Sequence, residues 1–148
     1  MRIPGLRSSY EKVGGIVSFG RLLDKIRLNA QGKLPEGWFT GPQVGADRRC
    51  VSFLHVTYEA LAKRVMQGGT DAEVLAWCFE HGRQPSVEEI EVWNEFSAKR
   101  GWRDNSTEAL ETAKREAGLE HRSDIQTWFD FQDADEEHNS HDRAAESG

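Results

Sequence analysis

The sequence has 148 residues, of which 37% are hydrophobic and 30% are charged, and its formal net charge is −6. This length predicts one domain with its own core, and the negative charge disfavours general binding to nucleic acid. No run of apolar residues is long enough to predict a membrane span, and the first residues lack the apolar stretch of a signal peptide. Cys50 and Cys78 are far apart and show no metal-binding spacing, so we expect two structural thiols in a reducing compartment, the cytoplasm.

The first third of the chain alternates irregular and helical patterns. Pro4 and Gly5 predict that residues 1–13 form an arm on the surface. A long helix is predicted over about 15–31. Residues 35–46 contain two prolines and three glycines, which predict a long irregular loop, and a short helix is expected near 47–54.

The remaining helices are marked by their first residues. A Ser or Thr, a Glu or Gln three residues later, and a 3.6-residue apolar period are typical of helix starts. This pattern predicts helices that begin at Thr57, Thr70, Ser86, Ser106 and Ser123. Residues 74–79 are apolar around most of the helix circumference, so this helix is the predicted centre of the core.

The end of the chain differs in composition from the rest. Apolar residues almost vanish after Phe131, which predicts a disordered acidic tail over 132–148 after a single helical domain over 1–131. No two-residue alternation indicates a strand, and no internal repeat is visible. The predicted fold class is therefore all-α, an irregular bundle of six or seven helices.

Arg27 is predicted to point toward the interior from the 15–31 helix. At roughly 100° per residue it falls close to the centre of that helix's apolar face. A guanidinium in that position needs a counter-charge, because an unpaired buried charge costs several kcal/mol. Asp24, three residues earlier, is the nearest candidate. The pair is either structural, or Arg27 lines a pocket for an anion or carboxylate.

Two neighbouring features suit either packing or binding. Trp38 and Phe39 lie in the 35–46 loop, where they either pack on the core or cover a ligand. Gly14 and Gly15 precede the first long helix, where free backbone amides attract anions, or they form a plain junction. No glycine-rich nucleotide-binding motif is present.

The sequence predicts no metal site and no cofactor. The histidines are scattered, and His138 and His141 fall in the predicted tail, where a designed metal site is not expected. No motif of a zinc hydrolase, a Ser/His/Asp hydrolase or a paired-carboxylate glycosidase is recognisable. The motifs do not indicate whether the chain is an enzyme.

Several short motifs in the first half form a set. They are Gly14-Gly15, Arg21-Leu-Leu-Asp-Lys25-Ile-Arg27, Asp47-x-Arg49-x-x-x-Phe53 and Gly68-Gly69-Thr70. This set resembles an uncharacterised bacterial family known as domain of unknown function five-zero-six-nine. The resemblance covers roughly residues 4–82, with the helices to about 131 as a variant extension. It implies no activity, cofactor or substrate, so it supports these positions without giving them roles.

These observations leave three hypotheses. The first is a module that binds a protein partner or a small anion without catalysis. The second is an enzyme or sensor with an anion pocket under the 35–46 loop, built from Gly14, Gly15, Asp24, Arg27, Trp38, Asp47 and Arg49. The third, nucleic-acid binding, has a net +5 in residues 1–33 in its favour and −11 in residues 34–148 against it. The sequence does not decide whether Trp102 is covered by this chain or by another.

Overall fold

The computed structural model describes residues 1–138, and this part of the chain contains seven α-helices and no strand. The helices are α1 (Phe19–Ala30), α2 (Gly45–Leu54), α3 (Tyr58–Met66), α4 (Asp71–His81), α5 (Val87–Lys99), α6 (Thr107–Glu116) and α7 (Trp128–Asp135). The prediction of an all-α fold with six or seven helices is confirmed. Within residues 1–138, no helix has both the length and the apolar character needed to cross a bilayer.

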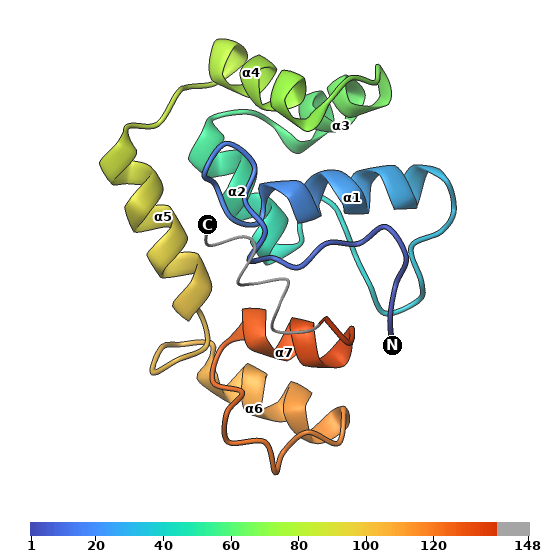
Figure 1. Ribbon diagram of the computed structural model, residues 1–148, viewed down its shortest axis with the longest axis vertical. Helices are drawn as coiled ribbons and strands as arrows, with labels where there is room; N and C mark the ends of the chain where they lie inside the picture. Colours follow the sequence, from blue (N-terminus) through green and yellow to red (C-terminus); the bar gives the residue numbers. More distant parts are fainter. Residues whose placement is uncertain (139–148) are drawn as a thin grey trace.

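The helices form two groups joined by α5. Helices α1 to α4 gather at one end of the molecule, α6 and α7 lie at the other, and α5 runs along one side between them (Figure 1). Helix α3 packs against α1, α2 and α4, whereas α7 packs against both α5 and α6. The face of α1 and α2 that looks toward α5 and α7 is therefore a junction between the two groups.

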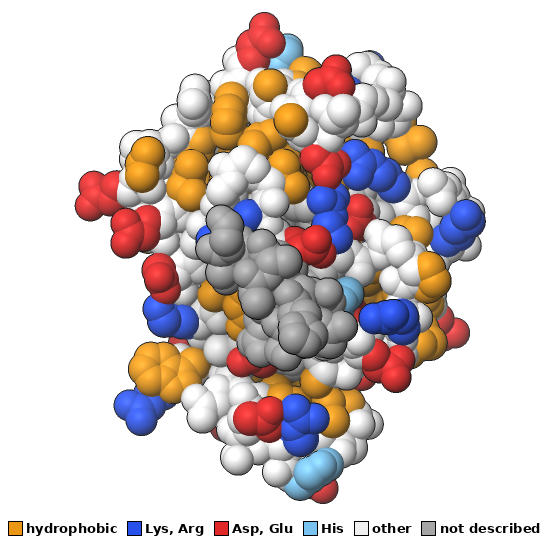
Figure 2. Space-filling model, viewed as in Figure 1, with side chains coloured by type: hydrophobic (Ala, Val, Ile, Leu, Met, Phe, Trp, Pro, Cys, Tyr) orange, Lys and Arg blue, Asp and Glu red, His pale blue; other side chains and the backbone are white. Residues whose placement is uncertain are grey.

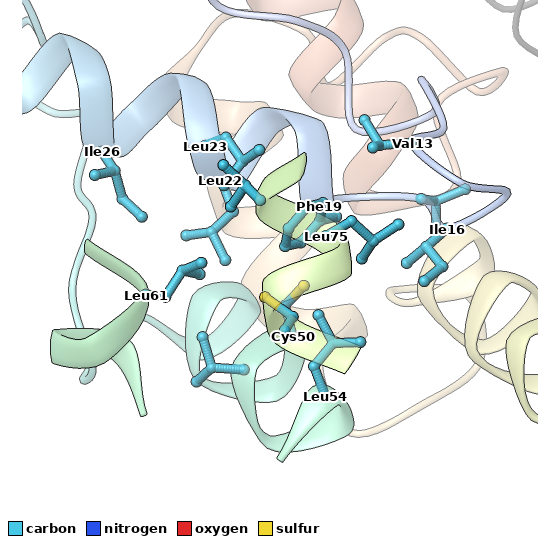
Figure 3. Close-up of a cluster of buried hydrophobic side chains, with 14 of the residues drawn as sticks. Val13, Ile16, Phe19, Leu22, Leu23, Ile26, Cys50, Leu54, Leu61 and Leu75 are labelled. Atoms are coloured by element: carbon cyan, nitrogen blue, oxygen red, sulfur yellow. The ribbon is translucent and has the colours of Figure 1, made fainter. Parts of the chain in front are cut away.

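The core is centred on α1. Nine of its twelve residues are buried, and Phe19, Leu22 and Leu23 meet Cys50 and Leu54 of α2 (Figure 3). The prediction that α4 forms the centre is wrong. Helix α4 buries one face, while Trp77 and Phe79 on its other sides are only half-buried. An apolar circumference did not distinguish a central helix from one at the edge of the core.

Side chains cap the predicted helix starts at Thr57, Thr70 and Ser86, but the start predicted at Ser123 is wrong, because α7 begins after Thr127, which caps it. Thr70 and Ser86 each form a capping box with the glutamate three residues later, and Thr57 accepts a hydrogen bond from Ala60. The predicted start of the first helix at residue 15 is wrong. Residues 13–16 form a tight turn closed by hydrogen bonds between Val13 and Ile16, and α1 begins only at Phe19.

Residues 1–13 and 132–138 pack on the molecule more than their composition indicated. Residues 1–13 are irregular as expected, but Ile3, Leu6 and Ser8 are buried in the molecule. The predicted disordered tail is wrong for residues 132–138, because α7 begins after Thr127 and runs to Asp135, and Glu136 is buried. The remainder of the predicted tail, residues 139–148, lies outside the described residues. Trp102 is 45% exposed, with the Arg103 guanidinium 5.0 Å from its ring centre.

Candidate functional site

A cavity of about 550 Å³ lies at the junction between the two helix groups. Its walls come from α1, α2, α5 and α7 and from residues 37–44 of the long loop. Seven aromatic side chains line it: Trp38, Phe39, Trp93, Phe96, Trp128, Phe129 and Phe131. Some are fixed by other contacts, since Trp93 donates to the Val17 carbonyl at 3.1 Å and stacks on Phe53. The cavity thus has several aromatic side chains in its wall, and some of them are held in place by the fold.

A buried ion pair joins α1 to the end of α7 on one side of the cavity. The Arg21 guanidinium donates to both carboxylate oxygens of Glu136 at 2.6 and 2.7 Å, and both side chains are almost fully buried. The indole of Trp38 donates to the same carboxylate at 2.9 Å. Burial alone would raise the pKa of Glu136, but the Arg21 and Trp38 hydrogen bonds and the Arg21 charge lower it. Glu136 therefore anchors the long loop to the helices beneath it.

A second buried pair joins α1 to α2. Lys25 Nζ lies 2.6 Å from Asp47 Oδ1, with side-chain exposures of 8% and 2%. The other oxygen of Asp47 accepts from the Thr40 hydroxyl and the Gly41 amide, and Thr40 also contacts the Tyr58 hydroxyl. Burial lowers the pKa of Lys25, and the Asp47 charge opposes that shift. Asp47 thus fastens the loop a second time.

Arg49 faces the cavity without a counter-ion. It lies one helical turn after Gly45 in α2, lines the cavity and is only partly exposed. No hydrogen bond or ion pair holds its guanidinium among residues 1–138. Burial lowers the pKa of Arg49, and the positive charges of Arg100 and Arg48 lower it further, while Asp104 opposes them. Arg49 is therefore a partly desolvated cation on which two positive charges and one negative charge act.

The reactive side chains of the wall are not arranged as nucleophiles. Burial raises the pKa of the Cys50 thiol in the wall, and it raises that of Cys78, which lies outside the wall, to about 12. Both thiols therefore stay protonated, which makes them poor nucleophiles. Lys25 is bonded to Asp47 rather than presented as a free amine. In the part of the chain that is described, no three His, Cys, Asp or Glu side chains gather as a metal ion would require.

Asp24 and Arg27 lie in a separate cluster outside the cavity wall. Arg27 is about one-third exposed and pairs with Asp71 at 3.0 Å, whereas Asp24 is 3.8 Å away. Arg7 binds both aspartates, at 2.9 Å to Asp24 and 2.7 Å to Asp71, and also donates to the Gly20 carbonyl. Burial opposes the Arg7 charge, but the two carboxylates outweigh it and raise the pKa of Arg7. We call Arg7, Asp24, Arg27 and Asp71 the Arg27 cluster.

The predicted site residues are thus divided by the fold. Trp38, Asp47 and Arg49 line the cavity, whereas Asp24 and Arg27 belong to the Arg27 cluster. Gly14 and Gly15 form the turn before α1, where a side chain at Gly14 would overlap Leu75 at 2.4 Å. Sequence reasoning missed Arg21, Lys25, Arg100 and Glu136. A signal existed for two of them, because Arg21 and Lys25 are four residues apart and share one face of a helix whose core side is otherwise apolar.

Comparison with known proteins agrees with the resemblance noted in the sequence. The chain matches the family described as domain of unknown function DUF5069 over residues 3–138. It belongs to this family. The match covers the cavity and all seven helices, so the sequence-based view of residues after 82 as a variant extension is wrong. Among curated proteins, none matches the sequence.

Proposed function

We propose that this DUF5069 chain is a binding module for a small organic molecule with an aromatic or apolar body. The observation that carries the proposal is the cavity of about 550 Å³ with seven aromatic side chains in its wall. Cavities of roughly 300–1,000 Å³ with apolar walls and a few polar groups are typical of small-molecule sites.

The polar groups of the wall support the same proposal. Arg21 and Lys25 are buried beside the cavity, and each is fixed by a carboxylate. Burying such pairs rarely improves stability over apolar packing, so their presence beside a cavity favours a role in shaping it. Trp38 and Thr40 fasten the 35–46 loop to those carboxylates, so the loop covers the cavity in a defined position. A wall held in this way binds with little loss of conformational freedom.

The other partner classes have less support. Positive and negative side chains are interspersed over the face shown in Figure 2 rather than gathered into an area of one sign, and the net charge is −6. Nucleic acid requires a continuous positive surface, so we do not include it in the proposal. We place the protein in the cytoplasm, since its two cysteines are buried free thiols.

The test is a fluorescence titration with N-phenyl-1-naphthylamine, a neutral aromatic probe that brightens when it leaves water. We expect saturable binding with one site per chain. Ala46 lines the cavity at the second position of α2, and Ala46→Phe should fill the space and weaken binding at least about tenfold. Ala72, an exposed alanine at the second position of α4, is the matched control, and Ala72→Phe should bind as the wild type does. Non-saturable binding, or equal binding by all three proteins, would overturn the proposal.

A further inference from the structure

We infer that the ligand of this cavity is an acid, and that Arg49 binds its carboxylate or phosphate group. This inference rests on the proposed function, because it assigns a chemical class to the molecule in the same cavity. The aromatic walls would hold the body of the ligand. The guanidinium of Arg49 would hold its charged end on the α2 side.

The first support is that Arg49 differs from the other cations of the wall in its ion pairing. Arg21 is bonded to Glu136, Lys25 to Asp47, and Arg100 to Asp104 at 3.4 Å. Arg49 alone among these four makes no ion pair or hydrogen bond with residues 1–138. A partly desolvated guanidinium without a counter-charge is unfavourable in the free protein. An anionic ligand would remove that cost, so binding is favoured for acids over neutral molecules.

The second support is the charge around Arg49. Arg100 and Arg48 act on it as positive neighbours, and within residues 1–138 the opposing carboxylate is Asp104. Asp104 is already engaged, since it accepts from the Gly101 and Ser106 amides and pairs with Arg100. Asp135 also lines the cavity, but it lies at the end of α7 and is not among the charges that act on Arg49. The α2 side of the cavity is thus positive.

The third support is the local geometry of α2. This helix begins at Gly45 in the cavity wall, and no side chain caps it. A Cβ atom at Gly45 would lie 3.4 Å from an Arg49 guanidinium nitrogen, so the guanidinium is folded back over the first turn of its own helix. Backbone amides of a first turn attract anions. Here they add to a cationic side chain that already faces the cavity.

The chemistry of the ligand follows from these groups. A guanidinium offers parallel N–H donors that match two oxygens of a carboxylate or a phosphate. The volume of about 550 Å³ leaves room for an aromatic body beyond the acid group. We therefore assign the cavity to a small aromatic or similarly flat apolar acid.

The experiment compares two probes that share both aromatic groups and differ by one anionic group. They are 8-anilino-1-naphthalenesulfonate and the neutral N-phenyl-1-naphthylamine. We expect the anion to bind at least about tenfold more tightly, since one charge-assisted pair is worth roughly that factor. Arg49→Gln should weaken anion binding by about tenfold and leave the neutral probe within about twofold. Arg115→Gln removes the same charge from an exposed position of α6 outside the cavity wall, and both probes should bind it nearly as they bind the wild type.

The outcomes separate this inference from the proposed function. If neither probe binds in a saturable way, the cavity is not a binding site and both statements fail. If both probes bind equally, or if Arg49→Gln weakens both to the same extent, only the acid assignment is overturned. If the anionic probe binds more tightly and Arg49→Gln removes that preference, competition by 1-naphthoate and 1-naphthyl phosphate distinguishes a carboxylate ligand from a phosphate ligand. Displacement by neutral 1-naphthol that equals displacement by both acids counts against the assignment. Thermal midpoints of the variants show that each is folded.

Discussion

Two charged regions flank α1, and they differ in how completely their charges are paired. In the Arg27 cluster, two arginines and two aspartates bind one another, and none of them lines the cavity. In the cavity wall, the Arg21 and Lys25 pairs are equally complete, but Arg49 has no counter-ion in the described chain. Both regions contain cations of α1 whose position near the core can be predicted from the helical period of the sequence. Of the two, the cavity wall has an open volume and a cation, Arg49, that no carboxylate of residues 1–138 pairs with.

The difference shows which observation points to function. An arginine near the core indicates only that a counter-charge is needed. When the chain itself supplies the carboxylate, as Asp71 does for Arg27, the arrangement is explained by the fold. When residues 1–138 supply none and leave space, as at Arg49, we expect a ligand to supply the counter-charge. Three substitutions or titrations test this distinction, beginning with the largest expected effect.

The largest effect is expected at the buried pair in the cavity wall. Glu136→Leu would leave the Arg21 guanidinium buried without its carboxylate. Removing one partner of a buried pair costs about 3–5 kcal/mol, because the remaining charge is uncompensated. The free energy of unfolding, measured by urea titration, should fall by that amount. The double variant Arg21→Met with Glu136→Leu should recover most of the loss, since it leaves no unpaired charge. A loss below about 1 kcal/mol, or a double variant no more stable than the single one, would contradict the pairing.

Sequence patterns predicted local structure better than they predicted this pairing. The capping boxes at Thr70 and Ser86 were predictable because both partners lie within four residues. The partner of Arg21 lies 115 residues away, in a stretch whose acidic composition is typical of a disordered tail. Glu136 becomes ordered because α7 delivers it to a buried cation, which composition does not reveal. The cavity was equally hidden, since its aromatic side chains come from separate elements brought together by α5.

The second largest effect is expected from acid. Both regions contain carboxylates that should contribute to a loss of stability at low pH. Arg21 lowers the pKa of Glu136, and Arg7 and Arg27 lower that of Asp71, although burial opposes both shifts. A carboxylate whose pKa is lower in the folded state contributes stability above its unfolded pKa, and loses it as pH falls through the folded pKa. The thermal midpoint should therefore hold from pH 7 to about 5 and fall below about pH 4.

A comparison of the wild type with Glu136→Gln isolates the contribution of Glu136 to this loss of stability in acid. Glu89 and Asp104 also have pKa values lowered to about 2, by hydrogen bonds in a helix cap and a turn, so several carboxylates act in the same range. Glu136→Gln removes the charge and keeps an acceptor for Arg21. The difference in midpoint between wild type and variant should shrink as pH falls from 5 to 2. A difference that stays constant over this range would show that Glu136 does not carry the expected charge.

The smallest effect is expected in the Arg27 cluster. Asp71 is about 29% exposed, and Asp71→Asn weakens its pairs with Arg7 and Arg27 without burying an isolated charge, because Asp24 remains beside both arginines. Partly exposed ion pairs contribute about 1 kcal/mol or less, so the free energy of unfolding should fall by no more than that. Binding of 8-anilino-1-naphthalenesulfonate should stay within about twofold of wild type, in contrast to Arg49→Gln, which should lose affinity and little stability. If Asp71→Asn changes affinity as much as Arg49→Gln does, the two regions are coupled, and completeness of pairing is not what separates a structural cluster from a binding site.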